Sequence, residues 1–301
     1  MHYNIGKESI TRLFVLLVLV FSSCMRDGEN LDECIRSMRI ELRWINTQPQ
    51  SSDEKVAIGV FPSSFGTRVD LESDIYGVDV DLLTDGYNIV GWEDHSNTNI
   101  DVTNHTISVE TSSDGMALSP NIFSAGFTHA EVTLSDANQV IPLPMYRQVR
   151  PVVIEINFIG DGYALVSGVT GTLKGIALER SLDNGFPPVS GLGRPAAIKS
   201  GNINYTFGLS DQAEAGIWYT GTQNLIGIDG NVAQTLDLEV SFTGESTPSP
   251  YSFDVTNQMA EYHTNKVDEP WYIIITLNLG ANLEIDIVDW IAGPESWVTA
   301  H

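Results

Sequence analysis

The chain is poor in cysteine and in basic residues, and both shortages limit what it can be. Its 301 residues include 2 cysteines, Cys24 and Cys34, which excludes a disulfide scaffold and an all-cysteine zinc site. Only 15 residues are Lys or Arg against 39 Asp or Glu, giving a formal net charge of −24. Nucleic-acid binding needs basic surfaces that neutralise phosphates, so this charge argues against a nucleic-acid partner.

Charged residues of both signs together make up only 18% of the chain, whereas 42% of residues are hydrophobic and 9% are aromatic. Disordered acidic segments combine high charge with few aromatic residues, so this composition indicates a folded protein. The length suits one large domain or two of ordinary size, each large enough to bury a core.

The longest uninterrupted apolar run is short and lies near the start of the chain, at residues 13–21. A membrane-spanning helix needs about 20 apolar residues, so this run is too short to cross a bilayer. It follows the basic residues Lys7 and Arg12 and precedes Ser22 and Ser23, which is the order found in secretory signals. Residues 1–23 are therefore predicted to be a signal peptide.

Cys24 follows directly, and the segment around it resembles the lipobox of bacterial lipoproteins, with Phe21 standing where Leu is usual. The resemblance implies that Cys24 is acylated and becomes the mature N-terminus. Residues 24–34 are then a polar, acidic tether, similar to the surface-export tethers of Bacteroidota lipoproteins. Several acyl chains hold a protein firmly on a membrane, whereas one chain holds it only marginally. The alternative is a soluble exported protein in which Cys24 pairs with Cys34.

Beyond residue 34 the hydrophobic pattern has a period of two, and no window keeps the spacing of an amphipathic helix. Apolar and polar residues alternate clearly in residues 35–44, 152–158 and 236–242, which indicates half-buried or buried strands. Residues 78–82 alternate in the same way, and the turn pair Asp85-Gly86 predicts a hairpin with residues 87–92. Other predicted strands are 56–61, 107–110, 127–134, and a closing hairpin of 271–279 with 283–288. The fold class is all-β, and the spacing of Gly and Pro favours a sandwich.

A domain boundary is predicted at Pro142 and Pro144, because two prolines around one residue favour an extended, rigid connection. Just after the prolines, Arg147 and Arg150 end an acidic stretch, residues 69–146, that contains no Lys or Arg. The first domain is therefore predicted to span residues 35–142 and the second residues 145–301.

Motifs for catalysis, metals or cofactors are weak. Asp79, Asp81 and Asp85 lie near one another, but the EF-hand pattern fails because its later ligand positions fall on Leu83 and Val90. A looser calcium site that also uses Asp74 stays open.

The glycine pattern at residues 191–196 contains Pro195 and lacks a βαβ context, so a loop is expected there. The histidines show no local zinc spacing, and we expect no enzyme activity, no cofactor and no metal.

Taken in order, several segments resemble a known family. They are the signal that ends at Cys24, the strand at 35–44, the acidic segment 76–90, the proline pair, and the segments 150–158 and 169–177. This order is similar to that of the fimbrillin-like lipoproteins of Bacteroidales, in particular FimB-type anchor and accessory subunits of type V pili. The resemblance implies two tandem transthyretin-like β-sandwich domains, attachment to the outer membrane, and a place in or beneath a pilus. It supplies Cys24 as the lipidation site and no catalytic residue.

The expected function is therefore structural: an outer-membrane surface lipoprotein that anchors a type V-like fimbria or serves as its accessory subunit. Other fimbrial subunits would bind by β-strand addition, with Leu283, Ile285 and Ile287 as C-terminal candidates that could instead simply close the second domain. The alternative is a membrane-tethered adhesin or carbohydrate-binding module without a polymer. Its sugar-stacking candidates are the aromatic residues Trp92, Trp218, Tyr219, Trp290 and Trp297.

Overall fold

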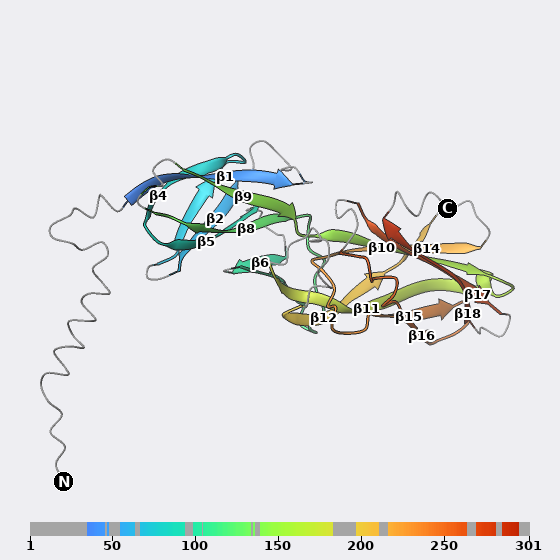
Figure 1. Ribbon diagram of the computed structural model, residues 1–301. Helices are drawn as coiled ribbons and strands as arrows, with labels where there is room; N and C mark the ends of the chain where they lie inside the picture. The colour runs from blue at the N-terminus through green and yellow to red at the C-terminus, as the bar shows by residue number, and fades with distance from the viewer. Residues whose placement is uncertain are drawn as a thin grey trace, which may run out of the picture.

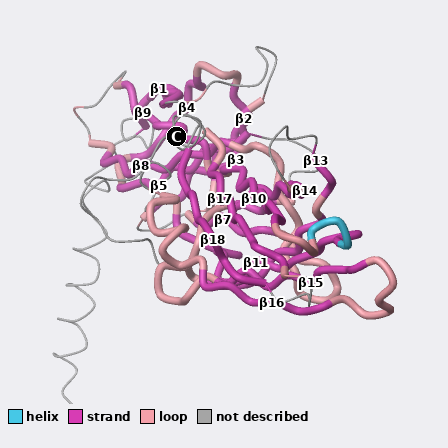
Figure 2. Tube along the Cα trace, turned by 90° about the vertical axis from the view of Figure 1, so that its right-hand side faces the viewer, coloured by secondary structure: helices cyan, strands magenta, loops and turns pink. Residues whose placement is uncertain are grey.

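The computed structural model describes residues 35–45, 47, 55–63, 67–93, 99–103, 105–133, 135, 139–182, 197–210, 216–263, 269–280 and 285–294. In this part of the chain there are strands β1–β18 and one short 3-10 helix, η2 (Tyr163–Leu165). The strands form two groups that lie end to end, so the molecule is elongated (Figure 1). Strands make up most of the described trace (Figure 2), and the predicted all-β class is confirmed.

The first group is a seven-stranded sheet in the order β3-β2-β5-β8-β9-β1-β4. Neighbouring strands are antiparallel except β1 and β9, which are parallel. The outermost strands β3 and β4 are joined by residues 74–76, so the sheet curls around its own hydrophobic core. Its strands are β1 (Ile35–Ile45), β2 (Val56–Pro62), β3 (Val69–Ser73), β4 (Gly77–Leu83), β5 (Gly86–Glu93), β8 (Ser124–Glu131) and β9 (Val140–Arg147).

The second group contains two further sheets with a larger hydrophobic core. One sheet has the order β13-β14-β10-β17-β18, and the other has the order β16-β15-β11-β7-β6, with β12 also paired to β11. The first consists of β13 (Gly208–Ser210), β14 (Ile217–Leu225), β10 (Arg150–Ile159), β17 (Trp271–Leu279) and β18 (Ile285–Pro294). The second consists of β16 (Ser249–Asp254), β15 (Thr235–Phe242), β11 (Val166–Ser181), β7 (Thr106–Val109), β6 (Ile100–Thr103) and β12 (Lys199–Thr206).

Alternation in the sequence located the strands of both cores correctly. On β1, Met38, Ile40 and Leu42 are buried, whereas the intervening Arg39 and Arg43 are exposed. On β10 and β15 every second residue is buried in the larger core: Val152, Ile154, Ile156, Phe158, Leu236, Leu238, Val240 and Phe242. A strand that has one face on a core needs apolar residues at every second position, which is why this signal can be read locally.

The predicted hairpin at Asp85-Gly86 is wrong, although both of its strands exist. β4 pairs with β1 at the edge of the sheet, whereas β5 pairs with β2 and β8 in its interior. The pair Asp85-Gly86 therefore carries the chain from one part of the curled sheet to another. The turn sequence indicated a change of direction but did not determine which strands became neighbours.

The predicted boundary at Pro142 and Pro144 falls inside strand β9 and is not a linker. β9 pairs with β1 over seven register positions, from Arg39–Val140 to Ile45–Tyr146. On its other side it pairs with β8 only from Gly126–Met145 onward, past both prolines. Proline has no N–H to donate, so it is compatible with a strand that is paired mainly along one side. The division into domains 35–142 and 145–301 stays a prediction.

A segment within the predicted first domain joins the sheets of the second group. β6 and β7 form a hairpin, and β7 pairs with the end of β11 at Ser181–Thr106 and Glu179–Ser108. The apolar residues of this segment belong to the larger core, and they are Val102, Ile107, Val109, Ala117 and Phe123. Residues between 100 and 123 therefore connect the two groups of strands by packing as well as by sequence.

Residues 148 and 149 alone lie between β9 and β10, and the surroundings of this connection are buried and polar. The backbone N–H of Gln148 donates to the carbonyl of Phe123 at 2.7 Å, and its side-chain Nε2 donates to the carbonyl of Ala125 at 2.9 Å. At the start of β10, the buried Arg150 donates to the carbonyls of Glu269 and Tyr262. Buried polar groups held by hydrogen bonds in this way favour one fixed arrangement of the connection.

Candidate functional site

The predicted lipidation site, Cys24, lies outside the described residues, as do the predicted signal peptide 1–23, the tether 24–34 and Cys34. Among the residues that the structure describes, no helix is long and apolar enough to span a membrane. The site that the structure does present is the C-terminal hairpin predicted from residues 271–279 and 283–288.

β17 and β18 form this hairpin, which confirms the prediction. They are antiparallel, and the register runs from Trp271–Pro294 to Leu279–Ile285. On its other side β17 pairs in parallel with β10, so it is fully enclosed within the sheet. β18 is the last strand of the sheet in this order, and among the described residues no strand pairs with its outer edge.

An edge strand presents a row of backbone N–H and C=O groups that another chain can pair with. In β18 this row is interrupted by an irregularity: Asp289 pairs with Thr276 and Ile287 pairs with Leu277, which leaves Val288 as the extra residue. Bulges and acidic residues such as Asp286 and Asp289 are features that limit unselective pairing at an edge. Among the described residues, the β18 edge is therefore unpaired, and one irregularity interrupts its register.

The strand beneath this edge is firmly held. Alternate residues of β17 are buried in the larger core, and these are Trp271, Ile273, Ile275, Leu277 and Leu279. The Trp271 indole donates from Nε1 to the carbonyl of Gln258 at 3.1 Å, and the Arg150 guanidinium lies 4.9 Å from its ring centroid. A rigid neighbouring strand lowers the ordering cost when a partner pairs with the edge.

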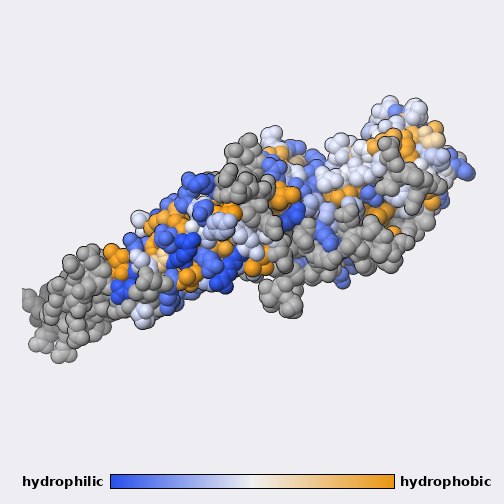
Figure 3. Space-filling view, turned by 90° about the horizontal axis from the view of Figure 1, so that it is seen from above, coloured by the Kyte–Doolittle hydropathy of each residue, from blue (hydrophilic) through white to orange (hydrophobic). Residues whose placement is uncertain are grey.

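The outward face of the same sheet is mixed in character. Asn157 and Trp218 face each other in the register of β10 and β14, and both are more than nine-tenths buried. Partial burial raises the pKa of Glu155, on the same face of β10. In the coloured part of the face drawn in Figure 3, apolar side chains form several separate patches between polar ones. Scattered apolar residues of this kind are ordinary on a protein surface, so the edge and not a face is the stronger candidate.

The aromatic residues proposed for sugar stacking do not form a platform among the described residues. Trp218 and Tyr219 are only 7% and 5% exposed, so a sugar ring cannot reach them and this part of the prediction is wrong. Trp92 is half-buried, and the Arg68 guanidinium lies 5.6 Å from its ring centroid. The side chains of Trp290 and Trp297 lie outside the described residues.

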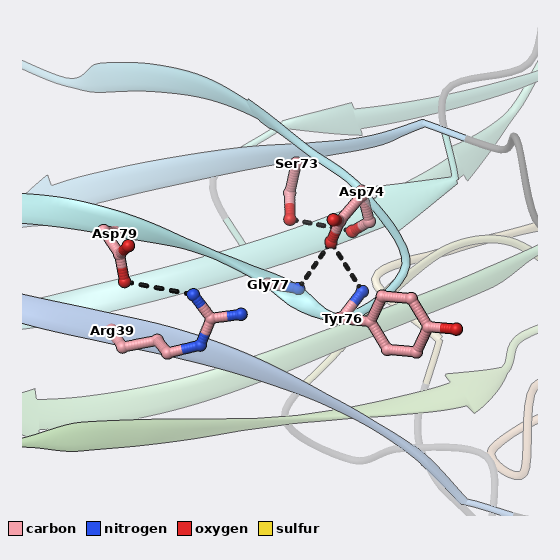
Figure 4. Close-up of polar contacts among 6 residues, drawn as sticks. All are labelled: Arg39, Ser73, Asp74, Tyr76, Gly77 and Asp79. Carbon is pink, nitrogen blue, oxygen red and sulfur yellow. Dashed lines mark hydrogen bonds and ion pairs between the residues drawn. The ribbon is translucent and has the colours of Figure 1, made fainter.

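The acidic residues considered for calcium each have a partner within the protein, and Figure 4 shows those of Asp74 and Asp79. Asp74 accepts hydrogen bonds from the backbone N–H groups of Tyr76 and Gly77 at 2.8 and 3.0 Å, and these bonds lower its pKa. Asp79 forms an ion pair with Arg39 at 3.1 Å across β1 and β4.

Two further carboxylates of this set, Asp81 and Asp85, accept hydrogen bonds from Ser37 and from the backbone N–H of Gly86. Across the described ranges, no group of three or more His, Cys, Asp or Glu side chains could hold a metal ion. The exposed Asp79 and Asp81 alternate with Val78, Val80 and Leu82, as expected for the solvated face of a strand. The glycine pattern at 191–196 lies outside the described residues.

Sequence reasoning missed the buried arginines. Arg150 and Arg180 are 0% and 3% exposed, although most arginines lie at surfaces. Burial lowers the pKa of Arg180 to about 10. Local sequence gave no signal for this burial, because Arg39 and Arg43 stand in similar alternating segments and are exposed.

Comparison with solved structures shows the same fold along nearly the whole chain. A candidate adhesin from Bacteroides ovatus has a TM-score of 0.61 at 16% identity, over 90% of this chain and 100% of that chain. The fimbrial anchor protein Mfa2 from Porphyromonas gingivalis has a TM-score of 0.58 at 9% identity, over 87% and 98%. A candidate polysaccharide-binding protein from Bacteroides thetaiotaomicron has a TM-score of 0.54 at 10% identity, over 86% and 98%.

These identities establish similarity of fold, and the predicted resemblance to fimbrillin-like proteins is confirmed at that level. The chain has the β-sandwich fold of these adhesins and fimbrial proteins. None of the three is described as an enzyme. No model of a known protein family and no curated protein matches the sequence.

Proposed function

We propose that this protein is a surface lipoprotein of the outer membrane, anchored through Cys24, that serves as an anchor or accessory subunit of a type V-like fimbria. It binds other fimbrial subunits by β-strand addition, and the edge of β18 is where they attach. The protein has no catalytic role.

The observation that carries this proposal is the similarity to the fimbrial anchor Mfa2 along almost the full length of both chains. A similarity limited to one sandwich would be weaker support, because β-sandwiches host many unrelated functions. Here the match covers 87% of this chain and 98% of the other, and in the described part of this chain β18 ends its sheet at an edge.

The arrangement of the molecule supports membrane attachment at one end and partner binding at the other. β1, the strand that follows the predicted tether, lies toward one end of the elongated molecule, and β17 and β18 lie toward the other (Figure 1). An anchor whose N-terminus is committed to lipid needs its partner site far from the membrane. The β18 edge meets that requirement.

The proposal is tested by tagging the protein in its native cell and extracting the outer membrane gently. The unmodified protein should copurify with other fimbrial subunits, and Cys24→Ala should leave the membrane fraction and carry those subunits away from it. A Cys24→Ala protein that stays fully bound to the membrane contradicts lipid anchoring. An intact protein that copurifies with no fimbrial subunit favours a tethered adhesin that acts without a polymer.

Strand addition is tested at the edge itself by single proline substitutions at Asp286 and Ile287. Adjacent residues of a strand point their N–H groups to opposite sides, so one proline removes a bond to β17 and the other removes only an outward N–H. The proline that removes only an outward N–H should leave the melting temperature of the protein unchanged, so this measurement shows which of the two variants it is. If it also loses its fimbrial subunits, strand addition at β18 is supported, and if it keeps them, the partner binds elsewhere.

A further inference from the structure

The sheet of β11, β12 and β15 has a polar hollow on the face turned away from the core. The hollow has a volume of about 680 Å³. We call it the β11 groove and define it by its floor and its wall. The floor is formed by Thr170, Gly171, Thr172, Lys174, Asn202, Asn204, Tyr205, Thr206, Asp237 and Glu239, and the wall by Asp114 and Met116.

Strand register places the polar floor residues in rows. In one row Thr206, Thr170 and Glu239 lie side by side on β12, β11 and β15, and in the next row Asn204, Thr172 and Asp237 do so. Neighbouring strands are about 4.8 Å apart, and residues on one face of a strand are about 6.6 Å apart. The floor is thus a lattice of hydroxyl, amide and carboxylate groups with fixed spacing.

Hydrogen bonds between strands hold the middle of this lattice in place. Thr172 donates from Oγ1 to Oδ1 of Asn204 at 2.9 Å, and Ser252 of β16 donates to Oδ1 of Asp237 at 2.6 Å. Lys174 forms an ion pair with Asp237 at 2.5 Å. The side chains therefore keep their orientation without a ligand, which reduces the ordering cost of binding.

The wall is also fixed to the floor. It is a tight turn in which the Ser112 hydroxyl donates to the carbonyl of Met116 at 2.9 Å and also binds Asp114. The next residue, Ala117, donates its N–H to the carbonyl of Asn202 on β12 at 2.8 Å. The turn stands beside the sheet, and this is why the face is hollow and not flat.

The charges in the groove select against anions. Its lining carries three carboxylates, on Asp114, Asp237 and Glu239, and one ammonium, on Lys174. The hydrogen bond from Lys174, with a second one from Ser252, lowers the pKa of Asp237, so this carboxylate is ionised at neutral pH. An acidic ligand would meet an excess of negative charge, whereas a neutral ligand would meet both donors and acceptors.

We propose that the β11 groove binds a neutral oligosaccharide. Hydroxyl and amide side chains can each donate and accept, which matches the hydroxyl groups of a sugar chain, and a floor that spans three strands suits a ligand of several sugar units. The only aromatic residue of the lining, Tyr205, is buried, so binding depends on hydrogen bonds and not on ring stacking. The affinity is therefore expected to be weak, with Kd about 0.1–10 mM. This inference is independent of the fimbrial role.

The test is titration of the full mature chain with α-1,4- and β-1,4-linked glucose hexasaccharides and with a chitin hexasaccharide, followed by NMR or calorimetry. A galacturonate hexasaccharide serves as the anionic comparison. At least one neutral probe is expected to bind, and the galacturonate probe is expected to bind at least about tenfold more weakly. The proposal is overturned if no neutral probe binds below about 10 mM, or if the anionic probe binds best.

Two variants locate the site. Thr172→Val keeps the shape of the side chain but removes the hydroxyl, and Asn202→Ala removes an amide from the next row; each should weaken binding at least about fivefold. Thr222→Val, on an exposed position of β14 outside the groove, is the matched control and should leave binding unchanged. Equal affinity in all three variants places the sugar elsewhere and overturns the proposal. Unchanged melting temperatures exclude a loss caused by unfolding.

Discussion

Arg180 of β11 donates a hydrogen bond from Nη2 to the side-chain Oε1 of Gln148, in the two-residue connection between β9 and β10. Gln148 is itself bonded to the carbonyls of Phe123 and Ala125, beside and within the first sheet, so this pair joins the two groups of strands. Gln148 is only 1% exposed and Arg180 only 3% exposed. The position of one group of strands relative to the other therefore depends on buried polar contacts as well as on the packing of residues 100–123.

Replacing Gln148 by Leu should destabilise the protein by about 2–4 kcal/mol, because it removes a buried acceptor from a charged donor and a buried donor from Ala125. The free energy of unfolding in urea measures the effect. Gln223→Leu is the control, since Gln223 makes one exposed bond to the carbonyl of Asn204 and should cost less than about 1 kcal/mol. Equal losses of unfolding free energy in the two variants would show that the buried bonds of Gln148 stabilise the protein no more than an exposed bond does.

Gly126→Ala should be destabilising by about 2–4 kcal/mol, because an added Cβ would lie 2.0 Å from the carbonyl oxygen of Pro144. This close approach exists only if β9 runs beside β8 as a strand. Gly208→Ala is a matched control, since an added Cβ there meets nothing within 4 Å. Thermal unfolding of both variants checks the expectation, and a Gly126→Ala protein as stable as Gly208→Ala would contradict the placement of β9.

The location of strands was predictable because a strand with one face buried has apolar residues at every second position. Such residues in β10 are Val152, Ile154, Ile156 and Phe158. The pairing of strands was not, because it depends on residues far apart in the chain. β4 and β5 follow each other across Asp85-Gly86 and yet belong to different parts of the sheet. The domain boundary predicted at Pro142 and Pro144 falls inside a strand for a related reason. A proline removes only its own N–H, and both prolines still pair with the parallel strand β1.

The candidate site was predictable in part. From the sequence, two roles were open for the C-terminal segment: binding a partner strand or closing the second domain. In the structure Ile285 and Ile287 lie in β18, the edge strand of its sheet. The β11 groove was not found, because its residues come from three strands whose register no local pattern contains. The sequence pattern that could have indicated the groove is the alternation of the polar residues Asn202, Asn204 and Thr206. Any strand with one face in solvent shows the same pattern.

The stability of the protein should respond to pH through Glu155. Burial raises the pKa of this carboxyl above its value in the unfolded chain, so the folded state keeps the proton to a higher pH. The associated stability is present at low pH and is lost as the pH rises through the raised pKa. Glu155→Gln should therefore melt higher than the unmodified protein at about pH 7, and the difference should shrink as the pH falls to about 4.

The control for this experiment is Glu245→Gln, which changes an exposed carboxylate by the same chemistry. It should shift the melting temperature little and without the pH trend. A gain in stability for Glu155→Gln that is the same at both pH values would contradict the assignment to the titration of Glu155.

The segment from 99 to 123 should be needed for full stability of the second group of strands. It contributes five buried residues to the larger core: Val102, Ile107, Val109, Ala117 and Phe123. A fragment of residues 145–301 should therefore melt at least about 10 °C below a fragment of residues 99–301, since removing packed side chains costs several kcal/mol. Circular dichroism measures both. Equal melting temperatures would show that residues 145–301 form a complete domain, as the sequence suggested.

The C-terminal end offers a last prediction about the partner. In β18 the final register pairs are Ile273–Ala292, Tyr272–Gly293 and Trp271–Pro294, so truncation after Ala292 removes only the last two. The truncated protein should keep its fold, with a melting temperature within a few degrees of the full chain, because most of the β17–β18 pairing remains. If the residues beyond Ala292 form part of the joint, this protein should stay on the membrane and lose its fimbrial subunits on extraction. Retained subunits would place the joint on the remaining edge of β18, while unfolding of the truncated chain would show that the end of β18 serves mainly to close the sheet.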